Sequence, residues 1–343
     1  MAAFTGQLRP NEIMGALFNM IISQEVFADN IKGTDLVDEA RVDGGLYGDT
    51  KLYYSTDALV SHEWGNDAEA ENLLALDRPE DPKCQAISLD QFRQIRVTVD
   101  NYLSKRAWGD EGAFSSFNSV MLGWLRDTKK VYDGTTYNCY IGTVEGASTK
   151  AEIEVDATDA KVLAEALANI MTEMTDYTRD FNDYKQLRRY SEDSIKIVFN
   201  SKYINKIKNV DLPVIFDNAG LKATFSKKVL PARYFGVVNT ASKVADAKTR
   251  SLVEQVIGGV HYFAGDVIAS GATAPAGTSY QEDDKVVAKI LVKLPPYMSA
   301  FETGTSFFNP RSLTENHYLT FGHNTIEYLK AYPMVTVRAK AAV

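Results

Sequence analysis

Cysteine and histidine are both scarce in this sequence. Only two cysteines occur, Cys84 and Cys139, together with four histidines. A disulfide framework would use more cysteines, and this pair lacks the spacing of a metal-binding motif. The first residues also lack the basic segment and apolar run of a secretory signal peptide. We therefore expect two free thiols in a reducing, cytosol-like compartment.

Long apolar runs are missing as well. The longest fall far short of the ~20 residues that a membrane-spanning helix needs, so no membrane span is expected. The formal net charge of −8 argues against a protein that neutralises phosphates over its whole surface. Two lysine pairs, Lys129-Lys130 and Lys227-Lys228, are too short to mark a nucleic-acid-binding surface.

The usual signatures of catalysis are also lacking. No GxSxG elbow, Walker A loop or GxGxxG fingerprint occurs. His317 and His323 are six residues apart, but no histidine stands in a zinc-binding motif, which favours structural histidines. The remaining histidines are His62 and His261. These absences predict no catalytic residues, no cofactor and no metal site, and hence a protein that is not an enzyme.

What the sequence does contain is enough apolar residue for a large core. The chain has 343 residues, of which 45% are hydrophobic and 24% charged, as in ordinary globular proteins. This length suits one large elaborated domain, or two or three subdomains.

The clearest secondary-structure signal in the sequence lies in residues 156–209. Apolar residues at helical spacing predict a long helix over Asp159–Phe181. A strand over 194–200 and a short helix over 202–208 are predicted next, in the phrase DSIKIVFNSKYINKIKN. Asn200 or Ser201 is the expected cap of the short helix.

The first third of the chain is predicted to form an N-terminal arm followed by an extended two-stranded segment, called the excursion below. Residues 11–27 have too broad an apolar face for a solvated helix, so something must cover them. Strands are predicted at 50–56 and, as the return leg, at 91–100. An acidic tip lies between the legs, and a two-stranded arm of this kind needs a neighbouring surface to be stable. The acidic residues of the tip are Glu63, Asp67, Glu69, Glu71, Asp77, Glu80 and Asp81.

The other predicted elements are a second helix and a mosaic of short strands. The helix covers 110–133 and is expected to stop at Asp133-Gly134, before a β-prone run over 136–144. Residues 269–280 and 301–322 are predicted to be loops, the latter rich in aromatic residues, and a strand is expected within 326–340. Short strands are also predicted at 214–216, 222–225, 234–238, 260–268 and 285–294.

This order of elements resembles that of tailed-phage major capsid proteins, which have the Hong Kong 97-type shell fold. The helix Asp159–Phe181 followed by DSIKIVFNSKYINKIKN, and the phrase FRQIRVTVDNYLSKRAW followed by a helix, are the residues that carry the resemblance. It implies an α+β fold with an N-arm, an extended β-hairpin loop, a spine helix, and peripheral and axial domains.

The resemblance also implies a division of the chain. Residues 1–45 would be the N-arm and 46–92 the extended loop. Residues 93–194 plus 326–343 would form the peripheral domain, with 111–132 as its spine helix, and 195–325 the axial domain. The protein would self-assemble into hexamers and pentamers of a shell around double-stranded DNA, without sequence-specific binding. Scaffolding, portal and decoration proteins would be partners, and the capsid would form in the host cytoplasm.

Contacts between copies are expected at a few positions. The acidic tip, with Glu63, Glu69 and Glu71, should dock on a basic patch of an adjacent copy, for which Lys129 and Lys130 are candidates. Phe307 and Phe308, in the aromatic 301–322 segment, are candidates for apolar contacts.

Three other interpretations fit the sequence. An encapsulin-type nanocompartment shell shares the fold and would enclose a protein cargo. A phage tail tube or sheath subunit also self-assembles, although the two long predicted helices argue against it. The alternative from another class is a soluble enzyme or ligand-binding protein with a site built from loops.

Overall fold

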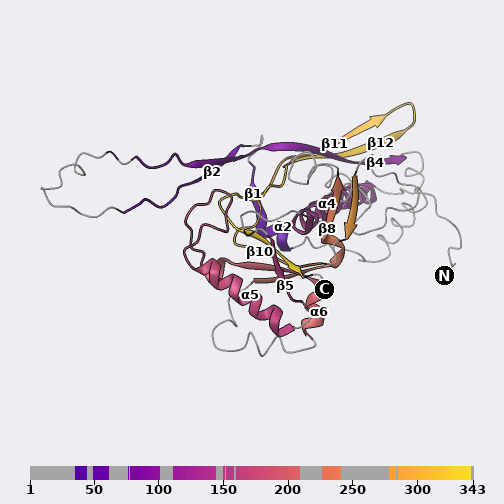
Figure 1. Ribbon diagram of the computed structural model, residues 1–343. Helices are drawn as coiled ribbons and strands as arrows, with labels where there is room; N and C mark the ends of the chain where they lie inside the picture. Colours follow the sequence, from indigo (N-terminus) through magenta and orange to yellow (C-terminus); the bar gives the residue numbers. More distant parts are fainter. Residues whose placement is uncertain are drawn as a thin grey trace, which may run out of the picture. The chain divides into compact units, whose positions relative to one another are not determined.

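The computed structural model of the chain is shown in Figure 1. It describes residues 35–44, 49–61, 76, 78–100, 111–143, 150, 152–157, 160–208, 226–240, 278–282 and 285–340. These residues fall into two compact units. Unit 1 draws on Met1–Asp49, Leu89–Tyr137 and Tyr297–Asn324, and unit 2 on Thr50–Ser88, Asn138–Pro296 and Thr325–Val343. The helix predicted at 11–27 and the strands predicted at 214–216, 222–225 and 260–268 lie outside the described residues.

Unit 1 combines helices with a four-stranded sheet of order β1-β11-β12-β4. β1 runs parallel to β11, and the other neighbours are antiparallel. A small apolar core of Leu125, Leu319 and Phe321 joins α4 to the sheet. The elements are α2 (Asp35–Ala40), β1 (Arg41–Asp43), β4 (Leu89–Asp100), α4 (Glu111–Thr143), β11 (Tyr297–Asn309) and β12 (Thr314–Asn324).

The prediction of a loop at 301–322 is wrong, because this segment is most of the β11–β12 hairpin. Nine of the thirteen residues of β11 pair with β12, from Ser299 opposite His323 to Asn309 opposite Thr314. A register irregularity between Ala300 and Thr303 is the place where the ladder is interrupted. The segment lacks the alternation of a half-buried strand because residues 301–308 are exposed on both faces of the ribbon.

The predicted end of the second helix at Asp133-Gly134 is also wrong, as is the β-prone run after it. Helix α4 continues to Thr143, over 33 residues. Every residue from Asp133 to Gly142 is buried, so packing on all sides overrides the weak helix propensity of the threonines and aromatics there. Up to Tyr137 the helix belongs to unit 1, and from Asn138 to unit 2.

Unit 2 is built on a five-stranded sheet of order β5-β13-β10-β6-β7. Helix α5 packs its apolar face on this sheet and forms the main core, with Leu163, Leu167 and Met174 against Val287, Val335 and Val337. Two-stranded sheets of β2 with β3 and of β8 with β9 complete the described strands. The elements are β2 (Lys51–Ser55), β3 (Lys83–Ile87), β5 (Glu152–Val155), α5 (Ala160–Thr175), η1 (Glu192–Ser194), β6 (Lys196–Asn200), α6 (Ser201–Lys208), β7 (Ser226–Leu230), η2 (Ala232–Tyr234), β8 (Gly236–Thr240), β9 (Thr278–Glu282), β10 (Val286–Leu291) and β13 (Met334–Ala339).

The predicted order of helix, strand and short helix is confirmed in α5, β6 and α6. Asn200 caps α6, since its Oδ1 accepts a hydrogen bond from the Lys202 amide at 3.0 Å. Helix α5 ends at Thr175 rather than at Phe181. Its last carbonyls are satisfied from outside, because Tyr190 N–H donates to Met174 and the Arg189 side chain to Thr175.

The return leg of the excursion was assigned to the wrong strand. β2 pairs with β3, from Lys51 opposite Ile87 to Ser55 opposite Lys83. β4, which covers the predicted return leg, instead pairs along its whole length with β12. Segments 93–100 and 314–324, which the sequence places in different domains, therefore share one sheet.

Gly142 lies where helix α4 passes close to η2. A Cβ added at Gly142 would overlap the backbone carbonyl of Tyr234, whereas one at Gly123, in the same helix, would meet nothing within 4 Å. We expect Gly142→Ala to lower the free energy of unfolding by about 1–3 kcal/mol, as overpacking does. The matched control Gly123→Ala should raise it by roughly 0.5–1 kcal/mol, because alanine favours helix. Urea unfolding measures both, and equal stability of the two variants would contradict this packing.

Candidate functional site

The β2–β3 hairpin of unit 2 carries large apolar side chains that remain in solvent. Leu52 and Tyr54 on β2 are more than half exposed, and beyond the strands Leu59, Val60 and Leu76 are about four-fifths exposed, Leu76 reaching 83%. A ribbon of two strands buries too little surface to be stable alone in water. Exposed apolar groups on such a ribbon are the mark of a surface that contacts a partner.

The β3 leg of this hairpin is held at its base by one buried glutamine. Gln85 Nε2 donates to the Tyr328 carbonyl and Gln85 Oε1 accepts from the Lys330 amide, each at 3.0 Å. Both bonds go to backbone atoms of the segment that leads into β13. The Gln85 side chain therefore satisfies a carbonyl and an amide that no neighbouring strand pairs with.

The β2 leg is held by the turn that follows α5. Gln186 and Arg188 donate to the carbonyls of Ser55 and Thr56, at 3.3 and 2.7 Å. Asp57 Oδ1 accepts from the Leu187 amide at 2.7 Å, and its Oδ2 pairs with Arg179. We call these contacts and those of Gln85 the hairpin clamp. The clamp fixes the base of the hairpin while its apolar side chains stay uncovered.

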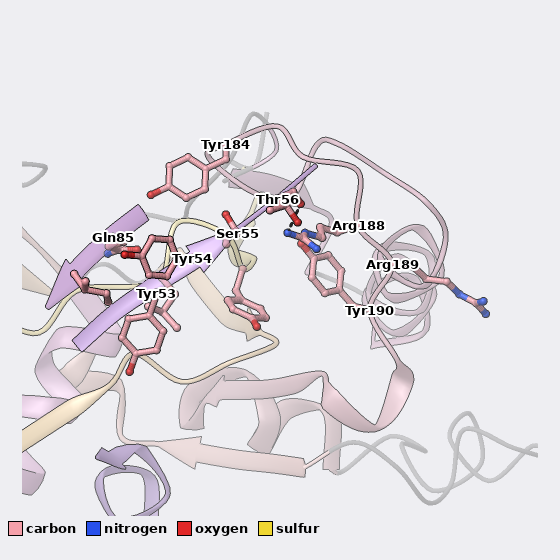
Figure 2. A pocket seen from close by; sticks show the side chains of 13 residues that line it. Tyr53, Tyr54, Ser55, Thr56, Gln85, Tyr184, Arg188, Arg189 and Tyr190 are labelled. Atoms are coloured by element: carbon pink, nitrogen blue, oxygen red, sulfur yellow. Dashed lines mark hydrogen bonds between the residues drawn. The ribbon is translucent and has the colours of Figure 1, made fainter. Parts of the chain in front are cut away.

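A cavity of about 510 Å³ lies beside the clamp, as Figure 2 shows. Five of its thirteen lining residues are tyrosines of β2 and of the two segments that hold it, namely Tyr53, Tyr54, Tyr184, Tyr190 and Tyr332. Burial raises the pKa of Tyr190 to about 12, so this phenol stays neutral at physiological pH. In Figure 2 the Arg189 side chain points away from the other labelled residues. The aromatic walls of this cavity suit packing against a polypeptide segment, and Arg188 adds a positive charge to its lining.

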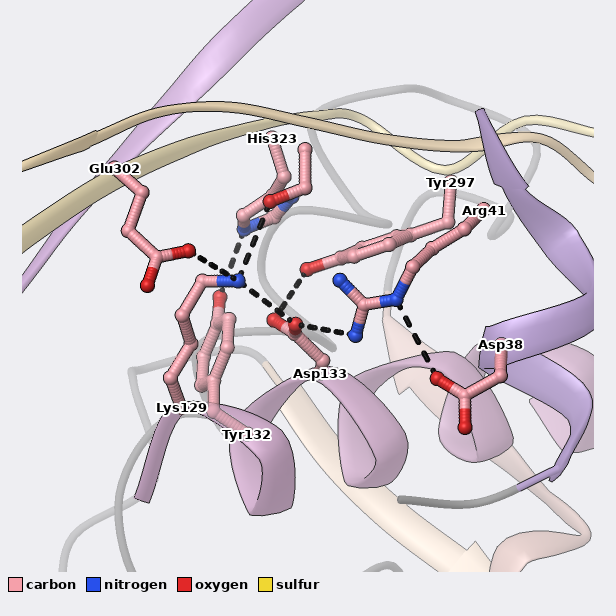
Figure 3. A network of polar contacts seen from close by, with 9 residues as sticks. Asp38, Arg41, Lys129, Tyr132, Asp133, Tyr297, Glu302 and His323 are labelled. Atoms are coloured by element: carbon pink, nitrogen blue, oxygen red, sulfur yellow. Dashed lines mark hydrogen bonds and ion pairs between the residues drawn. The ribbon is translucent and has the colours of Figure 1, made fainter. Parts of the chain in front are cut away.

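Unit 1 contains a network of buried charged groups, shown in Figure 3. Asp133 is fully buried and its carboxylate has three partners: Lys129 Nζ at 3.1 Å, Arg41 at 3.2 Å and the Tyr297 hydroxyl at 2.7 Å. Lys129 also reaches Ser299 Oγ at 3.3 Å and Glu302 at 3.5 Å. The network thereby joins β1, α4 and β11.

His323 lies beside this network and is fully buried. Its Nδ1 is 2.9 Å from the Asn324 carbonyl, which can only accept, so Nδ1 carries the proton. Nε2 is then free to accept from the Tyr132 hydroxyl at 3.0 Å. Burial lowers the pKa of His323, and the imidazole also stacks on Tyr297 with ring centroids 5.5 Å apart.

Of the contact residues predicted from the sequence, some lie outside the described residues, one is buried and the others are exposed. Glu63, Glu69 and Glu71 lie outside the described residues. Lys129 is 5% exposed and engaged with Asp133, so it is not available as a surface contact, whereas Lys130 is partly exposed beside Asp127. Phe307 and Phe308 are exposed on β11, at 60% and 46%. The structure does not bring the lysines and phenylalanines together as one site.

The other predicted chemistry-bearing residues are placed apart. His317 and His323 are both on β12, and Cys139 is buried in α4 while Cys84 is exposed on β3. Within the described part of the chain, no group of three or more histidine, cysteine or carboxylate side chains could hold a metal ion. None of the described helices is long and apolar enough to cross a membrane.

Sequence reasoning missed the hairpin clamp entirely. Gln85, Asp57 and Gln186 bind backbone atoms 130 or more residues away, and such partners leave no local pattern in a sequence. The one signal was the polar run Lys185–Arg189 between apolar residues of α5 and β6, which marked a break but not a contact.

Comparison with known proteins shows what the fold is similar to. The sequence matches no protein-family model, and no curated protein resembles it significantly. Solved structures do. A chain in the capsid structure of Staphylococcus phage Andhra has a TM-score of 0.60 at 9% identity, over 87% of this chain and 82% of that one. A chain in the structure of the head fiber and inner core protein gp22 of native bacteriophage P68 also has a TM-score of 0.60, at 12% identity, over 92% and 87%. The predicted α+β phage capsid fold is confirmed.

The hairpin clamp should depend on the charge of Asp57. Hydrogen bonds from Arg179 and from the Leu187 and Ala58 amides lower the pKa of this carboxyl. A carboxyl with a lowered pKa stabilises the folded state above its unfolded pKa, and that contribution is lost as pH falls through the folded value. We therefore expect a firm clamp at pH 7 that loosens below about pH 4.

Hydrogen exchange of residues 53–61 measures this effect. Asp57→Asn should exchange faster than the wild type already at pH 7, while Glu165→Gln, an exposed position on α5, should not. Protection that is the same in Asp57→Asn and wild type would mean that the ion pair does not hold the hairpin.

His323 should make unit 1 sensitive to mild acid. Because its folded pKa is lowered, the unfolded chain binds the proton more readily, and stability falls as pH drops below about 6.5. His323→Gln should be less stable at pH 7.5 but should lose less further stability between pH 7 and 5. Denaturant unfolding across this pH range gives the slopes, and parallel slopes for wild type and His323→Gln would refute the assignment.

Proposed function

We propose that this chain is the major capsid protein of a tailed phage. It is a structural subunit without catalytic activity, and it self-assembles through lateral contacts into hexamers and pentamers of an icosahedral shell around double-stranded DNA. The observation that carries the proposal is the β2–β3 hairpin, which is clamped at its base and uncovered along its apolar side chains. The likeness to the fold of a phage capsid chain supports it.

The physical argument begins with the hairpin. Its clamp orders the base before any partner binds, so less conformational entropy is lost on association. Leu59, Val60 and Leu76 would then bury their apolar surface on a neighbouring copy, each gaining roughly 1.5–3 kcal/mol when fully covered. That gain suits a contact between copies of the chain that forms only on assembly.

A second contact surface is the outer part of the β11–β12 ribbon. Phe307, Phe308 and Leu313 are about half exposed there. Phenylalanines that bury their rings at the centre of an interface contribute strongly to its stability. We propose that this aromatic end of the ribbon also packs on a neighbouring copy.

We propose the division of roles along the chain as follows. Residues 1–45 act as the N-arm and 46–92 as the extended loop. The rest of the chain forms the peripheral and axial domains, whose boundaries follow the two sheets rather than residues 195 and 326, because β4 pairs with β12 and β13 pairs with β10. The acidic tip of the loop, with Glu63, Glu69 and Glu71, docks near Lys130 of an adjacent copy. Charge complementarity supports this contact, because the tip is strongly acidic and Lys130 is accessible.

The proposed cargo is compatible with the charge of the subunit. A net charge of −8 disfavours tight binding of phosphates, which would hinder both the packaging and the release of DNA. The subunit would assemble in the host cytoplasm and end in the virion, with scaffolding, portal and decoration proteins as partners.

Assembly of the purified protein tests the proposal. Negative-stain microscopy and size-exclusion chromatography, with and without the scaffolding protein of the same phage, should reveal closed shells or capsomer-sized rings. Nuclease-resistant DNA in shells from infected cells would support a virion capsid, whereas an enclosed protein cargo would indicate a nanocompartment. A chain that stays monomeric even with scaffolding protein would overturn the proposal.

Two variants locate the contacts in the same assay. Phe307→Ser with Phe308→Ser should reduce the yield of assembled particles about tenfold or more, since two buried rings are lost. Glu69→Lys with Glu71→Lys should reduce it in low salt and less in high salt, because screening weakens exposed charge pairs. Val162→Ser, an exposed apolar position on α5, is the control and should assemble normally.

A further inference from the structure

The five-stranded sheet of unit 2 ends in two edges of opposite character. β5 and β7 are its outermost strands, and in the described part of the chain neither has a strand on its outer side. β5 carries Glu152 and Glu154, both exposed, and the Glu152 carboxylate also lies 3.5 Å from Arg338 Nε of β13. β7 has the sequence SKKVL, in which Lys228 is half-buried and Val229 is 43% exposed. An edge strand offers unpaired amides and carbonyls to another strand unless it is protected.

One charged residue of each edge, Lys228 on β7 and Glu152 on β5, lies on the same face of the sheet and at the same level. Backbone pairing links them residue by residue across the five strands. That row is Lys228, Val198, Lys289, Thr336 and Glu152. Lys228 and Glu152 are thus the two ends of one row, and side chains along such a row point to one face.

The next row has apolar residues at both ends. It consists of Val229, Phe199, Ala288, Val337 and Ile153. Phe199 and Val337 belong to the core under α5, so Val229 and Ile153 lie on the face that α5 covers. Side by side, two copies of this sheet would place lysine against glutamate on one face and valine against isoleucine on the other.

The strand directions allow this arrangement. β7 is parallel to β6, β10 is antiparallel to both β6 and β13, and β13 is parallel to β5. β5 and β7 therefore run in the same direction. A neighbouring copy related by a rotation about an axis roughly along the strands would pair its β5 in parallel with β7.

We propose that copies of this chain join head to tail, the β7 edge of one against the β5 edge of the next, with Lys228 beside Glu152. This inference rests on the proposed assembly of identical copies and specifies one of its contacts. Two β7 edges, or two β5 edges, would bring like charges together, which disfavours a two-fold dimer. Only the heterologous contact is matched, and repeating it through a rotation that closes produces a ring.

Disulfide trapping tests the contact directly. In a Cys84→Ser background, Lys228→Cys combined with Glu152→Cys should give, under mild oxidation, a ladder of dimers, trimers and larger linked species. Three strands separate the two edges of one chain, so the new cysteines cannot pair within it. Each single-cysteine variant should stop at dimers. No species beyond a dimer from the double variant would overturn the proposal.

Charge reversal supplies a second, independent readout. Lys228→Glu and Glu152→Lys should each lower the yield of rings or shells about two- to fivefold, and the double variant should recover most of it. Thermal unfolding of each variant checks that the subunit itself is intact. Recovery by the double variant is not expected if the two positions act separately, and its absence would count against the contact.

The outcomes separate this contact from the proposed function. Closed shells of wild-type protein without a ladder would remove the edge contact and leave the capsid proposal standing. A ladder without shells in the presence of scaffolding protein would keep the contact and overturn the capsid proposal. Monomers and no ladder would overturn both.

Discussion

Unit 1 depends on the burial of a charge. The Asp133 carboxylate has no exposed surface, and removing one partner from a buried ion pair leaves an uncompensated charge at a cost of about 3–5 kcal/mol. Its partners come from three elements: Lys129 from α4, Arg41 from β1 and Tyr297 from β11. Helix α4 must continue through Asp133 to keep Lys129 one turn away, and β1 must lie beside β11 to bring Arg41 in. One buried carboxylate therefore selects both the length of a helix and the order of a sheet.

In unit 2 the constraint is different: the apolar side chains of the β2–β3 hairpin are held in solvent and do not pack into the core of their own subunit. The hairpin clamp uses side chains that bind backbone atoms, so the base is fixed without hydrophobic cover. The apolar residues of the hairpin are thereby kept out of the core of their own subunit. In the proposed shell, the apolar surface that the clamp leaves uncovered would be buried only when copies assemble. The net charge of −8 makes copies of the chain repel one another, and in the proposed assembly this repulsion would oppose the attraction of the apolar surfaces.

Sequence reasoning succeeded where a signal was local and repeated. The helical spacing of Leu163, Leu167 and Met174 predicted α5 and its buried face, and Asn200 predicted the cap of α6. It failed where tertiary partners decide. The Asp133-Gly134 pair is a good local stop for a helix, yet the ionic partners of Asp133 hold it inside α4. Residues 301–308 of β11 lacked alternation because neither of their faces is buried. The partner of β2 could not be predicted because the residues of one strand do not by themselves specify which strand it pairs with.

The proposed closed shell would place two demands on its lateral contacts, and two different parts of the chain would meet them. The contacts must be weak enough one by one for a misplaced copy to leave, and directional enough that copies add in only one sense. Apolar side chains on the hairpin and ribbon are adaptable and carry little direction. Opposite charges at the two ends of one sheet row carry little energy, because exposed ion pairs contribute at most about 1 kcal/mol, but they distinguish head from tail. Summed around a ring, such small terms become decisive, since every copy makes the contact twice and closure removes all free edges. In the proposed assembly, the acidic and basic edges would therefore set the direction of contacts whose strength comes from the apolar surfaces.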